Sequence, residues 1–157
     1  MDIEQRISDA IRNFYASPDY SVYSMQPTDR HKQVHVEVGH RRADVDEQIA
    51  PLIAELWKRA LETGGSCQAR PEGSKHAGKA YVGFWRITQG EQFKSILDAA
   101  GMQCELEPKK PRLHRRRSDG TTSDELAFDG ANVLFKSTDI AKATEALRQI
   151  PLEDQIG

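Results

Sequence analysis

The sequence predicts an α+β fold: a two-layer sandwich in which an antiparallel or mixed sheet of about four to six strands carries helices mainly on one face, in a split β-α-β or ferredoxin-like arrangement. Strand-like and helix-like patterns follow each other in the order β-α-β-β-α-β, then β-α. The helical segments have one apolar face each, so each covers a single layer. A length of 157 residues suits one domain, which we expect to span residues 1–157.

The chain begins with a helical pattern and then a strand pattern. Apolar residues recur at helical spacing over residues 3–15, so we expect an N-terminal helix within residues 1–16. Val34–Val38 alternates apolar and polar side chains, which is typical of a half-buried strand.

A second helix is predicted over residues 45–62, because its apolar residues keep a 3.6-residue period. Asp44 and Glu47 have the spacing of a capping box at its start. Pro51 disturbs this prediction, since it either moves the regular start of the helix to near Glu47 or kinks the first turns. Two glycines follow the helix and are expected to end it, namely Gly64 and Gly65.

The second half of the chain alternates strands, helices and polar connections. The strand predictions are Ser66–Ala69, Ala80–Ile87, Met102–Glu107 and Asn132–Lys136. The helix predictions are residues 89–100, with Thr88 and Glu91 as a capping box, and residues 139–150. The remaining segments are a polar loop over residues 70–79, a charged loop over residues 109–124 and a frayed tail over residues 152–157.

Two of these units are alike. Ala80–Thr88 followed by a helix that carries Phe93 resembles Ala131–Thr138 followed by a helix that carries Leu147. Either the chain holds a diverged internal repeat, or a common strand-Thr-helix unit occurs twice by chance.

Composition excludes several classes of protein. With 38% hydrophobic and 29% charged residues, the chain is too apolar to be disordered and too polar to be a membrane protein. It contains no apolar run long enough to span a bilayer, and its first residues lack the pattern of a signal peptide, so we expect a cytoplasmic protein. Its two cysteines form no CxxC or similar spacing. We therefore expect no metal site and no cofactor.

The segment Asp44–Gln68 carries a resemblance. It reads Asp-x-Asp-x-x-Ile-Ala-Pro-Leu-Ile-x-x-Leu-Trp, followed about ten residues later by Ser-Cys-Gln, and an aromatic strand comes next. This pattern resembles that of small uncharacterised bacterial and phage proteins. The resemblance implies a shared fold and an origin in a phage or another mobile element, and it implies no activity.

A first candidate site surrounds Cys67, which follows a glycine turn. A thiolate there becomes a nucleophile if a histidine lies nearby, and the candidates are His35, His40 and His76. The alternative is that Cys67 is a small buried strand residue, as free cysteines usually are. The sequence contains no cysteine-hydrolase motif. It therefore favours a protein that is not an enzyme, and a cysteine-dependent enzyme that uses Cys67 remains the alternative.

A second candidate site is built from cations around the second predicted helix. Guanidinium groups near a helix N-terminus suit a phosphate or carboxylate, and a loop of Lys and Arg folds over such a ligand readily. The alternative is that the aspartates cap the helix and pair with the arginines at the surface. The candidate ligand-binding residues are Arg41, Arg42, Gln68, Arg70, Lys75 and Lys79.

A third candidate site is the basic block over residues 109–117, which holds six Lys and Arg residues and no Asp or Glu. Clustered cations neutralise phosphates, so this block is either a nucleic-acid site or a solvated loop. Its candidate residues are Lys109, Lys110, Arg112, Arg115, Arg116 and Arg117.

These candidates lead to one preferred hypothesis and three alternatives. The preferred one is a non-enzymatic module that binds a small phosphorylated or otherwise anionic ligand, such as a nucleotide. The alternatives are an RNA- or DNA-binding protein that uses the basic block, a cysteine-dependent enzyme that uses Cys67, and an interaction protein whose helix at 3–15 forms a homo-oligomer or partner face. None of these functions involves a membrane.

Overall fold

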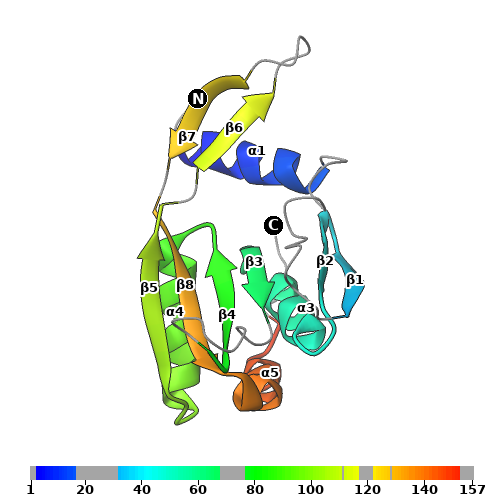
Figure 1. The fold of residues 1–157 in the computed structure, drawn as a ribbon, viewed down its shortest axis with the longest axis vertical. Coiled ribbons are helices and arrows are strands. Elements are labelled where there is room, and N and C mark those ends of the chain that lie inside the picture. Colours follow the sequence, from blue (N-terminus) through cyan, green and yellow to red (C-terminus); the bar gives the residue numbers. More distant parts are fainter. Residues whose placement is uncertain are drawn as a thin grey trace.

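The computed structural model describes residues 3–16, 32–67, 77–110, 112–116, 122–127 and 129–152. In chain order (Figure 1), the helices and strands are α1 (Ile3–Ala16), β1 (Gln33–Val38), β2 (Arg41–Asp46), α3 (Ala50–Lys58), β3 (Thr63–Cys67), β4 (Lys79–Phe84), α4 (Ile87–Ala99), β5 (Cys104–Lys109), β6 (Arg112–Arg116), β7 (Thr122–Ala127), β8 (Gly130–Lys136), a 3₁₀ turn (Ser137–Asp139) and α5 (Ile140–Arg148).

The main sheet has the strand order β3-β4-β8-β5, and every neighbouring pair is antiparallel. The connection β4-α4-β5 leaves a gap that β8 fills, which is the split β-α-β arrangement. The predicted fold class, a two-layer α+β sandwich, is therefore confirmed. In this chain the edge strand beside β4 is β3, which precedes β4 in the sequence. Two further strand pairs, β1-β2 and β6-β7, stand apart from the main sheet.

The two similar strand-helix units lie next to each other. Strand β4 leads into α4, β8 leads through the 3₁₀ turn into α5, and the two strands pair in antiparallel register about Val82 and Val133. Ala80 faces Phe135 and Phe84 faces Ala131 at equal distances along the strands from that pair. An approximate twofold axis therefore relates the two strands, whereas their helices pack differently, α4 against the sheet and α5 against α3.

One hydrophobic core lies between the sheet and the helices. Phe93 of α4 is fully buried, and its ring centroid lies 5.6 Å from that of Phe84 and 6.2 Å from that of Phe135. Helix α4 packs against β4, β5 and β8, and α5 packs against α3. Trp57 of α3 and Leu147 of α5 belong to the same core.

The prediction of a helix from residue 45 is wrong at its start. Gly39, with φ of 61°, and His40 form a tight turn that returns the chain, so Arg41–Asp46 pairs with β1 as a strand. Helix α3 begins only at Ala50 and has Pro51 in its first turn, where the missing N–H of proline leaves no helical hydrogen bond unmade. The helix ends at Lys58, before the two glycines, which belong instead to β3.

Two other local predictions also differ from the structure. Helix α4 starts at Ile87 with Arg86 at its N-cap and no side-chain cap, so Thr88 and Glu91 are not a capping box there. The segment predicted as a charged loop over residues 109–124 contains β6 and the start of β7, which pair in antiparallel register. Cross-strand hydrogen bonding has organised a segment whose composition alone indicated a loop.

Helix α1 closes the fold from the N-terminal side. Ile7 and Ile11 are buried in the common core, so this apolar face is used within the chain, and Ile3 is 53% exposed. Arg86 donates a 2.9 Å hydrogen bond from Nη2 to Ser8 Oγ and lies 3.3 Å from Glu4, which ties α1 to the end of β4. The use of α1 in a homo-oligomer stays a prediction. Within the described segments, every helix is too short or too polar to cross a membrane.

Candidate functional site

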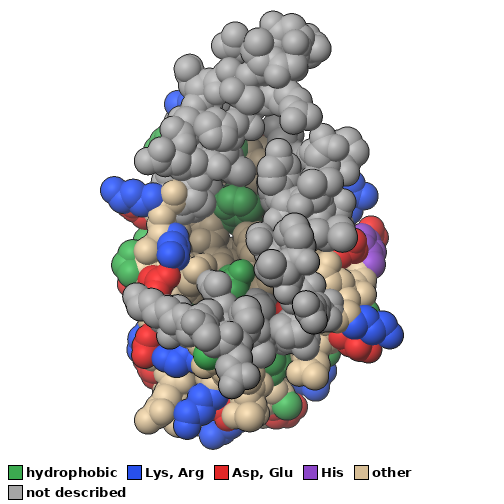
Figure 2. Space-filling model, viewed as in Figure 1, with side chains coloured by type: hydrophobic (Ala, Val, Ile, Leu, Met, Phe, Trp, Pro, Cys, Tyr) green, Lys and Arg blue, Asp and Glu red, His purple; other side chains and the backbone are tan. Residues whose placement is uncertain are grey.

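The second face of the main sheet, opposite the core, carries the candidate site. Along β4, Ala80, Val82 and Phe84 point into the core, so Tyr81 and Gly83 belong to the second face. Figure 2 shows the side of the molecule on which the strands lie in front of α4. Its charged side chains gather toward the margins, and described hydrophobic and uncharged groups occupy the middle.

A hollow of about 220 Å³ opens at the end of the sheet where β5 finishes and β8 begins. Residues of β3, β4, β5 and β8 line it, together with Trp85, which follows β4. The hollow therefore brings together segments that are far apart in the sequence. Its lining residues are Gly64, Gly65, Gly83, Phe84, Trp85, Lys109 and Asn132.

Two glycines in adjacent strands make the floor of this hollow. Gly65 and Gly83 are register partners, and a Cβ on Gly65 would have no atom within 4 Å. A Cβ on Gly83 would lie 2.9 Å from Asn132 Oδ1 and 3.2 Å from the carbonyl oxygen of Gly65. Gly83 therefore makes room for the Asn132 amide, whereas Gly65 leaves open space. A glycine inside a strand often marks a place where another group approaches the backbone closely.

The indole of Trp85 forms a fixed wall. Its Nε1 donates a 3.0 Å hydrogen bond to the Thr63 carbonyl, and Trp57 Nε1 donates one of the same length to the Thr63 hydroxyl. The register of β3 shifts between Thr63 and Gly65, and the intervening Gly64 lies against the Trp85 ring, where a Cβ would come within 3.1 Å of it. The ring is held from two sides and does not need to reorganise to meet a ligand.

Lys109 supplies a cation at the rim. Its side chain is 52% exposed, and its Nζ lies 2.7 Å from Glu107 Oε1. Glu107 is the register partner of Asn132, and Lys109 lies two residues further along β5, opposite Gly130, on the same face of the sheet. The hollow thus offers an exposed backbone floor, an aromatic wall, an amide that both donates and accepts hydrogen bonds, and a positive charge.

The structure places the predicted anion-binding residues elsewhere. Arg41 donates a 2.8 Å hydrogen bond to Glu62, and the two side chains are only 14% and 17% exposed. Lys79 pairs with Glu105 at 3.2 Å. Arg42 lies opposite Glu37 in the β1-β2 pair. None of these three lines the hollow. The expected position of Arg41 and Arg42 beside a helix N-terminus is wrong, because they lie in β2 and α3 begins only at Ala50. Three further candidates lie outside the described residues: Gln68, Arg70 and Lys75.

The two cysteines occupy opposite edges of the main sheet. Cys67 is on β3, and Cys104 is on β5 and free. The register runs from Cys67 through Tyr81 and Leu134 to Glu105, so Cys104 is one residue out of line and on the other face. Three strand spacings amount to about 14 Å, and a disulfide needs Cα atoms within about 7 Å. The two cysteines of one chain are therefore too far apart to pair.

The Cys104 thiol is expected to react slowly as a nucleophile. Burial and a 3.2 Å hydrogen bond from Sγ to Asp98 Oδ1 raise its pKa from 9.0 to about 11. Lys94 in turn holds Asp98 at 2.8 Å, which lowers the pKa of that carboxyl. A thiol that stays protonated at neutral pH is a poor nucleophile.

The histidines proposed as partners of Cys67 have other contacts. His35 Nδ1 lies 3.0 Å from Asp44 and Nε2 lies 3.1 Å from Glu37, so carboxylates hold both ring nitrogens. The hydrogen bonds with Glu37 and Asp44 raise the pKa of His35. Burial and the nearby charges of Arg41 and Arg12 lower the pKa of His40. His76 lies outside the described residues.

The basic block is divided between two strands in the structure. Lys109 ends β5, Lys110 is exposed, and Arg112, Arg115 and Arg116 belong to β6. Arg117 lies outside the described residues. Strand β6 pairs with β7, which brings Glu125 opposite His114.

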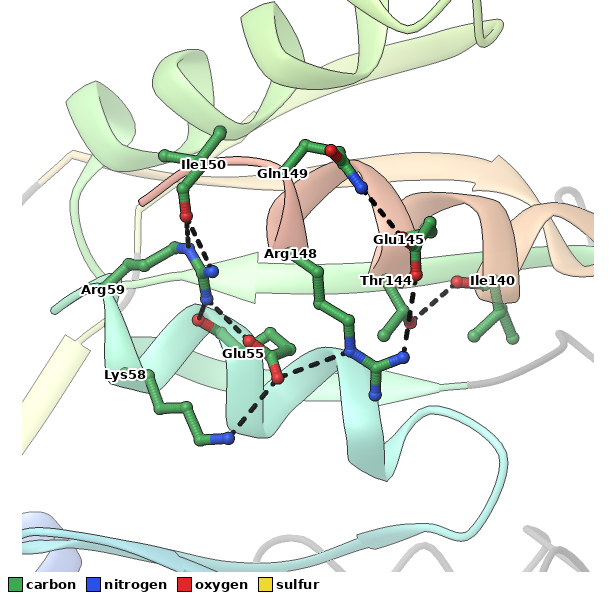
Figure 3. Close-up of polar contacts among 9 residues, drawn as sticks. All are labelled: Glu55, Lys58, Arg59, Ile140, Thr144, Glu145, Arg148, Gln149 and Ile150. Atoms are coloured by element: carbon green, nitrogen blue, oxygen red, sulfur yellow. Dashed lines mark hydrogen bonds and ion pairs between the residues drawn. The ribbon is translucent and has the colours of Figure 1, made fainter. Parts of the chain in front are cut away.

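A charged cluster that the sequence analysis missed lies between α3 and α5 (Figure 3). Glu55 is 9% exposed, and Arg59 lies 2.7 Å from it, with Lys58 and Arg148 at 3.4 and 3.6 Å. Arg59 also donates to the Glu55 and Ile150 carbonyls. All these contacts are internal to the fold, so we assign the cluster a structural role. The spacing of Glu55 and Arg59 by four residues on a helical pattern was its one visible signal.

Among the described residues, no three His, Cys, Asp or Glu side chains are grouped so as to hold a metal ion. No protein-family model, curated protein or solved structure matches this chain.

Proposed function

We propose that this protein is a non-enzymatic binding module for a small, planar, anionic ligand of nucleotide type, and that the hollow beside Trp85 is where it binds. The observation that carries the proposal is the pairing of Gly65 with Gly83 in adjacent strands, with open space above Gly65. In this hollow an aromatic wall, an amide and a lysine converge over two positions that carry no side chain. That combination suits a flat ring lying against the backbone.

The size of the hollow indicates how much of the ligand is enclosed. Pockets for whole drug-sized ligands measure about 300–1,000 Å³. A hollow of about 220 Å³ suits a base-sized ring, with the rest of the ligand extending outward. Lys109 lies at the rim, where an ammonium group meets a phosphate that stays in contact with solvent. The anion must compete with Glu107 for this lysine, which favours modest affinity.

Asn132 gives the hollow a means of recognising the ring. A side-chain amide donates two hydrogen bonds and accepts two, so it matches the mixed donor and acceptor edge of a nucleobase. Its Oδ1 lies where a Cβ on Gly83 would come within 2.9 Å of it, so the amide sits beside the glycine floor. A purely apolar ring would leave this amide without a partner and bind less well.

Isothermal titration calorimetry tests the proposal with adenosine, guanosine, cytidine and uridine and their 5′-monophosphates. We expect at least one monophosphate to bind, and Gly65→Leu to weaken it by tenfold or more by filling the hollow. Lys109→Gln is expected to weaken the monophosphate and to leave the matching nucleoside unchanged. Lys142→Gln, at an exposed lysine on α5, is the matched control.

Two outcomes contradict the proposal. One is the absence of binding for every nucleoside and monophosphate. The other is binding that Gly65→Leu leaves intact while circular dichroism shows the variant folded. A native mass spectrum of the gently purified protein adds an independent test, because a nucleotide carried from the host appears as extra mass that denaturation removes.

The alternative hypothesis, a cysteine-dependent enzyme that uses Cys67, is tested by one substitution. Cys67→Ser is expected to leave nucleotide binding intact. If the purified protein shows a hydrolytic or transfer activity that this substitution abolishes, the enzyme alternative replaces the proposal.

A further inference from the structure

We infer that the ring bound in the hollow beside Trp85 is guanine, and that Glu107 is the residue that selects it. This inference rests on the proposed function and names the class of nucleotide. The Glu107 carboxylate accepts hydrogen bonds from N1–H and from the N2 amino group of guanine, and the Asn132 amide donates one to its O6. The two side chains belong to the second face of the sheet, one on β5 and one on β8.

The first support is the position of Glu107 beside the hollow. It is the register partner of Asn132, and neighbours of that kind on one face of a sheet have Cβ atoms about 4.5–5.5 Å apart. Its Oε1 lies 2.7 Å from the Nζ of Lys109. Asn132 and Lys109 both line the hollow, so Glu107 adjoins two of its lining residues. The Glu107 side chain is 32% exposed, which leaves it accessible to a ligand.

The second support is that an acid beside a phosphate site needs a partner in the ligand. The Glu107 carboxylate repels a phosphate and competes for Lys109, so a ligand recognised by its phosphate alone would bind better without it. An ionised carboxylate only accepts hydrogen bonds, and its two oxygens have about four lone-pair sites. It can therefore hold Lys109 and accept from a base at the same time. A base that offers donors turns Glu107 from a cost into a contact.

The pattern of donors distinguishes guanine from the other bases. Guanine has an N2 amino donor and an O6 acceptor, with N1–H between them, so two adjacent donors face one carboxylate. Adenine and cytosine offer one amino group beside a ring nitrogen that accepts. Uracil and thymine place carbonyl oxygens on both sides of their single N–H, and a carboxylate repels those oxygens. Glu107 together with Asn132 therefore matches guanine best.

The third support is the reach from the glycine floor to the carboxylate. Gly83 pairs with Asn132, and Asn132 pairs with Glu107, so two strand spacings, about 10 Å, separate the backbones of Gly83 and Glu107. A purine has two fused rings and extends further across the sheet than a pyrimidine does. A ring that lies over the floor beside Trp85 therefore brings its edge to Glu107 more easily if it is a purine.

Isothermal titration calorimetry with guanosine, inosine and adenosine tests the inference on the unmodified protein. Nucleosides isolate the ring from the phosphate, and inosine differs from guanosine only in lacking the N2 amino group. We expect guanosine to bind about tenfold or more tightly than inosine, because a hydrogen bond to a charged acceptor contributes on that scale. Adenosine should also bind more weakly than guanosine.

Glu107→Gln tests the residue itself. The glutamine keeps the length of the side chain but replaces one accepting oxygen by an amino group, which cannot accept from guanine. Guanosine should then lose about tenfold in affinity and bind about as weakly as inosine. The matched control is Glu105→Gln, on the same strand and the same face, where Glu105 is 63% exposed, pairs with Lys79 and does not line the hollow. Circular dichroism shows whether each variant is folded.

The outcomes separate this inference from the proposed function. If monophosphates bind and Gly65→Leu weakens them, but guanosine binds no more tightly than inosine and adenosine, the inference is overturned and the proposed function stands. A guanosine preference that persists in folded Glu107→Gln also overturns the inference alone. If no nucleoside or monophosphate binds, both are overturned. A preference lost in Glu107→Gln and kept in Glu105→Gln supports both.

Discussion

The guanidinium of Arg59 donates two hydrogen bonds, of 3.2 and 2.9 Å, to the backbone carbonyl of Ile150, which lies 91 positions further along the chain (Figure 3). The carbonyls at the end of a helix have no intrahelical partner, and Arg59 supplies one just after α5. The same side chain holds Glu55 at 2.7 Å. One residue on the end of α3 thus fixes the position of the last helix.

Replacing Arg59 by alanine is expected to destabilise the protein by about 3 kcal/mol, because it leaves the buried Glu55 without its main partner. The two side chains are 10% and 11% exposed. Urea unfolding followed by circular dichroism measures the change. Lys58→Ala is the matched control, since Lys58 is 46% exposed at 3.4 Å from Glu55 and should cost less than about 1 kcal/mol. Equal losses in the two variants would contradict the structural role of Arg59.

Glu55 should make the stability depend on pH in the acid range. Burial alone raises the pKa of Glu55, but the hydrogen bond from Arg59 and the charge of Lys58 outweigh burial and hold the pKa below its ordinary value of 4.5. Because the pKa is lower in the folded state, this stabilisation is present above 4.5 and is lost as the pH falls through the folded value. The free energy of unfolding of Glu55→Gln should therefore change less between neutral and acid pH than that of the wild type. Glu91→Gln, at an exposed glutamate on α4 outside this cluster, is the matched control.

The neighbouring glycines Gly64 and Gly65 should respond in opposite ways to alanine. A Cβ on Gly64 would lie 3.1 Å from the Trp85 ring, so Gly64→Ala must displace the indole, at a cost of about 1–3 kcal/mol. A Cβ on Gly65 meets nothing within 4 Å, and alanine in a strand loses less conformational entropy on folding, so Gly65→Ala should stabilise by about 0.5 kcal/mol. Urea unfolding measures both, and tryptophan fluorescence should shift in the Gly64 variant alone. A large loss of stability in Gly65→Ala would show that the space above Gly65 is filled.

Cys104 should resist alkylation. In a Cys67→Ser background, iodoacetamide at about pH 8 should modify Cys104 roughly 100-fold more slowly than a thiol of ordinary pKa, because its pKa is raised from 9.0 to about 11. Asp98→Asn removes the negative charge beside the sulfur and should speed the reaction, as intact-mass spectrometry can show. Rapid modification in the Asp98-containing protein would contradict the position of the thiol.

In the unmutated chain, oxidation at low protein concentration should give no Cys67–Cys104 disulfide.

Two histidines should titrate on opposite sides of the ordinary pKa of 6.5. The hydrogen bonds with Glu37 and Asp44 raise the pKa of His35, while burial and the charges of Arg41 and Arg12 lower the pKa of His40. Proton NMR titration of the ring signals measures both values in one experiment. Asp44→Asn should move the titration of His35 downward and leave that of His40 unchanged. The reverse order of the two titrations would contradict the β1-β2 geometry.

The helices and strands predicted correctly are those in which the apolar positions of the sequence pattern are also the buried positions of the structure. Val34–Val38 is inside β1, the N-terminal helical pattern is α1, and the strand and helix of each strand-helix unit are β4-α4 and β8-α5. Periodicity is less informative where a segment fits two structures. The segment Arg41–Asp46 continues into a helical pattern, yet pairing with β1 across the turn at Gly39 makes it a strand.

The candidate site was only partly visible in the sequence. Lys109 stood out within a run of cations, but Gly65, Gly83 and Asn132 had no local signal of function. Their importance comes from register, which places Gly83 between Gly65 and Asn132 across three strands. Arg41 illustrates the opposite case, because its charge was visible and its partner Glu62, on another segment, was not.

The sequence by itself determined the α+β class and most of the helices and strands, because those depend on hydrophobic periodicity within single segments. Only the tertiary structure decided the order of strands in the sheet, the hollow on its second face and the contact between Arg59 and Ile150. Each of these joins residues distant in the chain, and their pairing is set by which arrangement buries the common core and satisfies the backbone, a choice that no single segment encodes.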